Sequence, residues 1–444
     1  MRVRCQLMAA AVALLALVSL VTPLRLCAEV SSAALGGCCL ASGSEAGDLV
    51  LVVPTNGATV RTHTPLQDSY LLLPAATRRS DAWFGSDVQR TKLAGTRPLA
   101  THPQKTLLVW RGGSAPYTVR VSKGGSHDAE VAVFENVMSM SCAIDNLEIG
   151  CAYRWSVECA VGRAEGSFCT SPDAPRLLRA GSRVDADGVC HADVSNVRDM
   201  GGYVGLHGHR VRQGLLIRCA QLDRRNDVSE MESLLSDESY AFFNDFLRVK
   251  TDIDLRGESK VEPLGPGVRL LSAEVHAYGY YSSADRPDYS TTSFRRIMKT
   301  LAKRESYPVI FHCAAGQDRT GCVAYILGAL LGIGEEHLAK DWEASVFHNA
   351  KGAFGFNAKG LGPAKGDYCN LDLFIRNLRT FGRPTMRENA EAWARRCGCT
   401  DADIERFRTI MLEDYDSGNS PQIGMVPGSV SGADAGGCGI GREV

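Results

Sequence analysis

Hydrophobic and polar residues alternate along several short stretches in the first third of the chain. Two of these stretches carry apolar residues at every second position: Tyr117, Val119 and Val121, and then Tyr153, Trp155 and Val157. Alternation with a period of two is typical of half-buried strands. Glycine and asparagine separate the stretches, so the pattern predicts a β-sandwich over residues 49–172.

The pattern changes beyond Pro172 and Pro175, because prolines in a polar stretch end a sheet. Residues 250–256 then predict a strand that ends in charged residues, and the compact apolar stretch 307–312 predicts a second strand. A stretch that is apolar on every side predicts a buried helix at 320–331. Further helices are predicted at 335–345, 371–381 and 402–413. Strands that alternate with helices indicate an α/β domain, which we place at 180–415, with a mostly parallel central sheet flanked by helices.

Both ends of the chain differ from these two units. Arg2 and Arg4 precede an apolar run at 7–20, which is typical of a secretory signal peptide and predicts one at 1–28. The run is shorter than the roughly 20 residues of a membrane span, so no stable span is expected after cleavage. Residues 29–48 are predicted as a linker and 416–444 as a disordered tail. We therefore expect a secreted or cell-envelope protein, with a lipid anchor at Cys38 as the alternative.

Composition narrows the classes of partner. A chain of 444 residues suggests two or three domains, and its formal charge of −1 provides no general attraction to nucleic acid or anionic membranes. The ten histidines show no ligand spacing, so no metal and no cofactor is predicted. Four clustered cysteines suggest disulfides in an exported protein, with free thiols as the alternative: Cys142, Cys151, Cys159 and Cys169.

One short segment, His312–Gly321 (HCAAGQDRTG), joins the predicted strand at 307–312 to the buried helix. A phosphate monoester is a dianion, which several backbone N–H groups at a helix N-terminus can hold together. Small residues let the backbone approach such an anion closely. The segment therefore predicts a phosphate-binding loop in which His312 braces the loop from the strand end. The predicted substrate-binding residues are His312, Ala314, Ala315, Gly316, Gln317, Thr320 and Gly321.

Cys313 and Arg319 lie at the two ends of this loop. A thiol at a helix N-terminus ionises more readily than a free thiol, so we predict that Cys313 attacks phosphorus and forms a phosphocysteine. The planar guanidinium of Arg319 offers donors to two phosphate oxygens. Thr320 is predicted to donate a hydrogen bond to the departing thiolate. A buried cysteine in an ordinary strand–helix turn is the alternative interpretation.

The loop resembles the pattern H-C-x-x-G-K-D-R-T-G of bacterial tyrosine and serine phosphatases. Further segments resemble the same family in the same order: Asn196–Tyr203 (NVRDMGGY), Arg210–Arg218, Ile253–Arg256 and Asp341–Ser345. The resemblance covers about 190–415 and implies a cysteine-dependent protein-tyrosine phosphatase that acts on phosphorylated proteins or peptides. Gln317 stands where the family usually has lysine, which is linked to activity on phosphoinositides. Glutamine keeps a donor without the charge, so phosphoinositides are the less expected substrates.

Three aspartates compete for the role of general acid. The resemblance points to Asp318 within the loop. Asp254 lies at a predicted strand end, where catalytic residues of α/β folds gather. Asp199 is the third, with a structural role as its alternative. Arg198 is predicted either to hold the loop or to contact substrate, and the aromatic run Tyr278–Tyr281 either to line a ring pocket or to pack elsewhere.

The sandwich region carries a second resemblance. Leu147, followed by Tyr153, Trp155 and Val157, resembles the late strands of a fibronectin type III domain, with Trp110 on an early strand. Another small β-sandwich is the alternative. The whole chain thus predicts a secreted protein phosphatase. Two alternatives are a phosphoprotein-binding or adhesion module with an inactive loop and a rhodanese-like sulfurtransferase.

Overall fold

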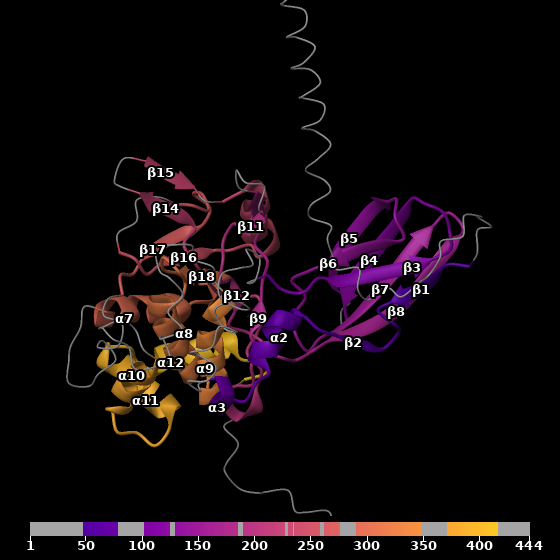
Figure 1. Cartoon of the computed structure of the whole chain (residues 1–444). Coiled ribbons are helices and arrows are strands. Elements are labelled where there is room, and N and C mark those ends of the chain that lie inside the picture. The colour runs from indigo at the N-terminus through magenta and orange to yellow at the C-terminus, as the bar shows by residue number, and fades with distance from the viewer. Residues whose placement is uncertain are drawn as a thin grey trace, which may run out of the picture.

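The computed structural model describes residues 48–78, 102–124, 129–184, 190–226, 230–233, 235–257, 262–275, 290–347 and 371–415 (Figure 1). The predicted signal peptide and disordered tail and nearly all of the predicted linker lie outside these ranges, as does the aromatic run at 278–281. No helix in the described ranges is long and apolar enough to cross a membrane.

The N-terminal region contains two sheets that share one core. The larger has the strand order β2-β8-β7-β4-β5, with β2 (Ala58–Val60), β8 (Gly162–Thr170), β7 (Ala152–Cys159), β4 (Tyr117–Lys123) and β5 (Ala129–Val137). The smaller has the order β1-β3-β6, with β1 (Val50–Val53), β3 (Thr106–Arg111) and β6 (Ser141–Ile144). All of their pairings are antiparallel except that of β2 with β8.

Alternation of side chains builds the core between these sheets. Trp110 and Leu108 of β3 pack with Trp155 of β7 and Phe168 of β8 in one buried cluster. The rings of Trp110 and Tyr117 meet edge to face at 5.2 Å. The strands predicted from period-two alternation at 117–121 and 153–157 are thus present, each with one face in the core.

Residues 65–78, which the sequence pattern placed within the sandwich, form two short helices instead. They are α2 (Pro65–Leu71) and α3 (Ala75–Arg78). Thr64 caps α2 in a capping box with Gln67, a local signal that a β interpretation overlooked. Tyr70 and Leu71 pack against Ala344 and Phe347 of the C-terminal unit rather than against the sandwich.

The C-terminal unit is built on a six-stranded mixed sheet of order β17-β16-β18-β13-β12-β9. Four neighbouring strands are parallel: β17 (Arg269–Ser272), β16 (Thr251–Asp254), β18 (Val309–His312) and β13 (Leu216–Cys219). The outer two are antiparallel: β12 (Arg198–Asp199) and β9 (Arg176–Leu177). The predicted α/β domain with a mostly parallel core is confirmed, and its antiparallel edge makes the sheet mixed.

Helices cover both faces of this sheet. One face packs on α7 (Ser290–Leu301), α8 (Asp318–Leu330), α9 (Glu335–Glu343), α10 (Leu371–Arg379), α11 (Met386–Arg396) and α12 (Asp401–Met411). The other face packs on α6 (Asp237–Ala241) and the π-helix η3 (Phe242–Phe246). In Figure 1 the orange and yellow helices gather beneath the strands β16 and β18. Eleven of the thirteen residues of α8 are buried, as its all-round apolar sequence predicts.

Short elements complete the two units. Two-stranded sheets are formed by β10 (Ser182–Val184) with β11 (Cys190–Ala192) and by β14 (Asp223–Asn226) with β15 (Glu230–Ser233). The 3₁₀-helices are η2 (Leu206–Gly208), η4 (Arg304–Ser306) and η5 (Ala344–Phe347).

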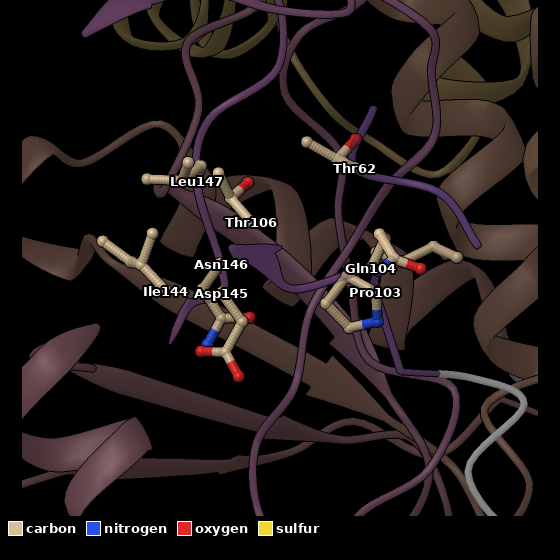
Figure 2. Close-up of a pocket in the computed structure, with 9 residues that line it drawn as sticks. Thr62, Pro103, Gln104, Thr106, Ile144, Asp145, Asn146 and Leu147 are labelled. Carbon is tan, nitrogen blue, oxygen red and sulfur yellow. The ribbon is translucent and has the colours of Figure 1, made fainter. Parts of the chain in front are cut away.

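Arginine side chains join the sandwich to the C-terminal unit. The buried Arg176 of β9 donates to the carbonyls of Leu147 (3.1 Å) and Asn146 (2.5 Å) and also pairs with Asp199 of β12. Arg210 donates to the carbonyl of Ile149 at 2.6 Å. Figure 2 shows the small pocket beside this junction, which Asn146 and Leu147 line together with Thr62 and Gln104.

The clustered cysteines form no disulfide among the described residues. Cys142, Cys151 and Cys159 are partly buried free thiols, and Cys169 is exposed on β8. In the structure these four cysteines are therefore free thiols, which was the alternative to disulfides.

Candidate active site

The predicted phosphate loop lies where a central parallel strand meets a buried helix. β18 ends at His312, residues 313–317 form the loop, and α8 begins at Asp318. The first amides of a helix have no partner within the helix and carry the positive end of its dipole. The loop therefore lies at the site in this fold where an anion is best stabilised.

Three carbonyls of the loop are held by donors outside it. The backbone N–H of Gln221 donates to Ala314 (3.1 Å). The side chain of Asn196 donates to Ala315 (3.0 Å), and that of Arg218 donates to Gly316 (2.8 Å). Because the C=O and the following N–H of a trans peptide point in opposite directions, the next three amides face away from these donors.

Those amides have no acceptor in the described part of the chain. Residues 314–319 donate no backbone hydrogen bond there, whereas Gly321 already donates to the carbonyl of Gln317 at 2.8 Å. A row of amides that converge without an acceptor is a nest for an anion. The arrangement can thus hold the non-bridging oxygens of a phosphoryl group.

Glycine is required at two positions of this motif. Gly316 has a φ of +64°, and a Cβ there would lie 2.3 Å from the carbonyl oxygen of Cys219. A Cβ at Gly321 would lie 2.9 Å from the ring of Trp342 on α9. The first glycine lets the loop turn against β13, and the second lets α8 pack closely on α9.

A buried ionic network supports the loop from behind. Asp341 of α9 accepts from Arg198 (Nε, 2.9 Å) and from Arg218. Ser345 lies within 3.3 Å of the Asn196 amide and accepts from Arg198 at 3.0 Å. Burial would raise the pKa of Asp341, but the two arginines outweigh it and hold this pKa below its usual value. We call these five residues the bracing network.

The contacts of Arg198 favour one of its two predicted roles, which is to hold the loop. Its side chain is 1% exposed, and its donors reach Asp341, Asn196 and Ser345. A guanidinium held in this way supports the loop and does not face solvent. Its prediction as a substrate contact is therefore not supported by the geometry.

Cys313 and Arg319 differ in exposure, as their predicted tasks require. Cys313 is 3% exposed and belongs to the main core cluster. Arg319 is partly exposed and makes no hydrogen bond or ion pair within the described ranges. Its donors are thus available to a ligand above the loop. Thr320 is fully buried, and its hydroxyl has no hydrogen-bond partner in the described structure.

His312 lies behind the loop rather than in it. It is fully buried, and its Nε2 forms an ion pair with Asp252 of β16 at 3.0 Å. Burial lowers the pKa of His312, but the carboxylate of Asp252 raises it further, so the net direction is upward. This position fits the predicted role of His312 in bracing the loop from the strand end, and the geometry gives no support to a contact with substrate. Gln317, in contrast, is partly exposed at the N-cap of α8.

The three aspartates have different surroundings. Burial raises the pKa of Asp318 to about 6, against the opposing charges of Arg319 and Arg218, and its side chain is partly exposed. Asp254 accepts from the backbone and the guanidinium of Arg256 at 2.8–2.9 Å, and these contacts lower its pKa in spite of burial. Of the three aspartates, Asp318 thus combines a position in the loop and partial exposure with a raised pKa.

Asp199 has a structural environment. Its two oxygens accept from the amides of Gly201 (2.8 Å) and Gly214 (2.6 Å) and from Arg176 (2.8 Å), and it is fully buried. Burial raises its pKa. Its oxygens accept from donors within the C-terminal unit, which matches the structural alternative for this residue.

Several residues that hold the loop were not assigned this role from the sequence. Asn196 and Arg218 stand in the segments quoted for the family resemblance, as do Asp341 and Ser345, but nothing in a linear motif shows that they meet. Gln221 and Asp252 belong to no motif at all. The signal that could have found Asn196 is its φ of +60°, a conformation that asparagine tolerates better than most residues.

Comparison with known proteins gives a family match to the same region. A profile of the tyrosine phosphatase family matches residues 190–413. A Cupriavidus necator protein whose name describes it as a tyrosine-protein phosphatase is 30% identical over 196 residues, which are 40% of this chain and 70% of that protein. A tyrosine-protein phosphatase of Nostoc commune is 30% identical over 60 residues, which are 14% of this chain and 20% of that protein.

Among solved structures, P. aeruginosa TpbA in complex with pTyr is similar at 20% identity. The match covers 44% of this chain and 85% of that chain, with a TM-score of 0.23.

Proposed function

The chain belongs to the tyrosine phosphatase family, and from this membership we propose that it hydrolyses phosphotyrosine in proteins or peptides through a phosphocysteine on Cys313. Phosphoserine and phosphothreonine are the further substrates of the proposal. The observation that carries it is the row of amides between Cys313 and Arg319, for which the described residues provide no backbone acceptor. A nucleophile, an anion nest and an available guanidinium then meet at one helix N-terminus.

The first step of the proposed reaction transfers the phosphoryl group to sulfur. The Cys313 thiolate attacks phosphorus in line, an S–P bond forms, and the P–O bond to the tyrosine oxygen breaks. The departing oxygen takes the bond's electron pair and accepts the proton of Asp318. Arg319 and the loop amides hold the non-bridging oxygens as charge develops on them.

The second step releases phosphate. Asp318, now a carboxylate, takes a proton from a water molecule, whose oxygen attacks phosphorus. The S–P bond breaks and returns its electron pair to sulfur, which regenerates the thiolate. The buried hydroxyl of Thr320 is proposed to donate a hydrogen bond to that sulfur. Arg198 and His312 act from behind the loop, as support rather than as substrate contacts.

Gln317 supports phosphoproteins over phosphoinositides as substrates. It is partly exposed at the N-cap of α8, so its amide can donate to a ligand without adding positive charge. A multiply phosphorylated inositol headgroup carries more negative charge than a phosphotyrosine and depends more on cations.

We further propose a domain organisation for the chain and its export from the cytoplasm. The region at 49–172 is proposed as a fibronectin type III-like unit, because its two sheets share one core and Trp110 lies on β3. Residues 180–415 are proposed as the catalytic domain, with 1–28 as a signal peptide that directs the bacterial protein to secretion or the cell envelope. The apolar run after Arg2 and Arg4 supports export.

Turnover of p-nitrophenyl phosphate by the wild type and by Cys313→Ser tests the proposed chemistry. We expect phosphate release by the wild type and loss of at least about 10³-fold in kcat for the variant, because the nucleophile is absent. Lys250→Met, a change at the exposed residue just before β16, is the control and should retain turnover. Wild-type turnover without dependence on Cys313 would overturn the proposal. Sulfur transfer from thiosulfate would instead indicate the sulfurtransferase alternative.

A panel of phosphopeptides and phosphoinositides tests the proposed substrate class. We expect phosphotyrosine peptides to be the best substrates by kcat/KM. Preference for a phosphoinositide would reject the assignment based on Gln317 while leaving the phosphocysteine chemistry intact.

A further inference from the structure

We infer that an N-terminal arm, residues 62–78, is a positioning element of the phosphate loop and acts through a buried ion pair between Arg78 and Glu343. This inference rests on the proposed function, because the loop it positions is the one that binds the phosphoryl group. The arm lies outside the family-matched residues 190–413. The family resemblance therefore gives no reason to expect it at this site.

The arm is docked on the C-terminal unit along its length. His63 lies 2.7 Å from the carbonyl of Pro175 through its Nε2. Tyr70 is fully buried and its ring meets that of Phe347 edge to face at 6.1 Å. Figure 1 shows α2 between the two units and α3 near α9.

The arm ends in a buried positive charge, the guanidinium of Arg78, which is paired with a carboxylate. Arg78 is fully buried, its Nε lies 2.5 Å from Glu343, and its Nη1 donates to the carbonyl of Leu73. Glu343 is itself 3% exposed. Removing the guanidinium takes a charged donor away from the buried carboxylate of Glu343, which is destabilising locally. The pair thus fixes the position of the end of α9 relative to the arm.

The end of α9 is the part of the fold on which the bracing network depends. Asp341 and Ser345 lie two residues before and two residues after Glu343. Asp341 holds Arg218, whose other branch donates to the carbonyl of Gly316, and Ser345 contacts Asn196, which donates to the carbonyl of Ala315. Buried polar contacts on both sides of the backbone segment 341–345 therefore link Arg78 to the loop amides.

Displacement of the end of α9 would turn these carbonyls and the amides that follow them. An error of about 1 Å in the position of a catalytic group can reduce the rate about 100-fold. Arg78→Met in the full chain should therefore reduce kcat/KM for p-nitrophenyl phosphate about 10- to 100-fold and weaken orthophosphate binding by a similar factor. Arg78→Lys keeps a charge for Glu343 and should recover part of both losses.

Arg408→Met is the matched control. Arg408 is also buried, at 5% exposure, and pairs with Glu391 and Glu405 at 2.6 Å, but it has no contact with the bracing network. All variants are compared at a temperature where near-ultraviolet circular dichroism shows each of them folded. The control should lower the melting temperature while kcat/KM stays within about twofold.

Two outcomes would overturn the inference. One is a folded Arg78→Met protein with wild-type kcat/KM and wild-type orthophosphate affinity. The other is an equal loss of kcat/KM and orthophosphate affinity in Arg408→Met, which would show that general destabilisation causes the effect. Orthophosphate affinity, measured by calorimetry, separates this inference from the proposed function. If the wild type binds orthophosphate but does not turn over substrate, the function fails and the positioning role is still tested by the affinity of Arg78→Met.

Discussion

At the scale of single residues, surroundings decide which aspartate can carry a proton. Asp254 lies at a strand end beside the loop, but Arg256 holds it as a carboxylate and lowers its pKa. Asp318 lies at the first position of α8, where burial raises its pKa to about 6. A group that donates a proton in one step and accepts one in the next works best when its pKa is near the working pH.

Asp318→Asn tests this assignment through the leaving group. General acids typically contribute 10²–10⁴-fold, so kcat for phenyl phosphate, a poor leaving group, should fall at least about 100-fold. The loss for p-nitrophenyl phosphate should be below about tenfold, because that leaving group needs little protonation. The wild type should also lose activity on phenyl phosphate as pH rises above about 6, since Asp318 then loses its proton. An equal loss on both substrates, or an unchanged pH profile in the variant, would reject the acid role.

The same residues show how far a sequence can predict a site. Cys313 and Arg319 follow from the spacing of a linear motif, and the structure places them at the two ends of one loop. Arg198 and His312 stand in equally conspicuous motifs, yet their donors are directed inward to Asp341 and Asp252. The direction in which such a side chain points depends on which face of its strand meets the helices. A shift of one residue in the strand register would reverse that direction.

At the scale of elements, the strand, the loop and the helix form one rigid unit. β18 is hydrogen-bonded between β16 and β13, and α8 is buried along most of its length. Both elements were predicted from continuous apolar stretches within a few residues of their observed ends. The helices α7 and α11 were not predicted, since α7 begins with the run Ser-Thr-Thr-Ser, which favours helix weakly, and α11 is rich in charged residues. Their stability comes from packing on α12 and α8, which a local pattern does not contain.

Gly316→Ala tests whether the loop depends on its close approach to β13. The added Cβ would meet the carbonyl of Cys219 at 2.3 Å, so the loop must shift, and kcat/KM should fall about 100-fold. Gly382→Ala is the control: its φ of +67° is similar, but a Cβ there meets nothing within 4 Å. Both variants should lose about 1–2 kcal/mol of stability from the left-handed backbone. Retained activity in Gly316→Ala, measured on p-nitrophenyl phosphate, would show that the loop tolerates the shift.

At the scale of the whole molecule, the sandwich and the C-terminal unit are joined by polar contacts rather than by a shared apolar core. Their buried clusters are separate. The contacts between them are carried by Arg176, Arg210 and Gln213, which reach the carbonyls of residues 146–149. No pattern of hydrophobic residues marks such a junction. The sequence therefore indicated two units and a Pro-rich boundary, and not the contacts that hold the units together.

Arg176 is the contact on which this junction depends most. It is 3% exposed, bonds two carbonyls of the sandwich, and also pairs with Asp199 inside the C-terminal unit. Arg176→Met removes all three contacts and leaves the buried Asp199 with only its two backbone donors, which costs about 3–5 kcal/mol. Since the two cores are separate, the lost coupling should appear as a split transition: the wild type should unfold in one calorimetric step, and the variant in two.

The control is Arg163→Met, which removes an exposed ion pair on β8 that is worth at most about 1 kcal/mol and should keep the single step. Two resolved steps in the wild type, or a single unshifted step in Arg176→Met, would show that other contacts couple the units.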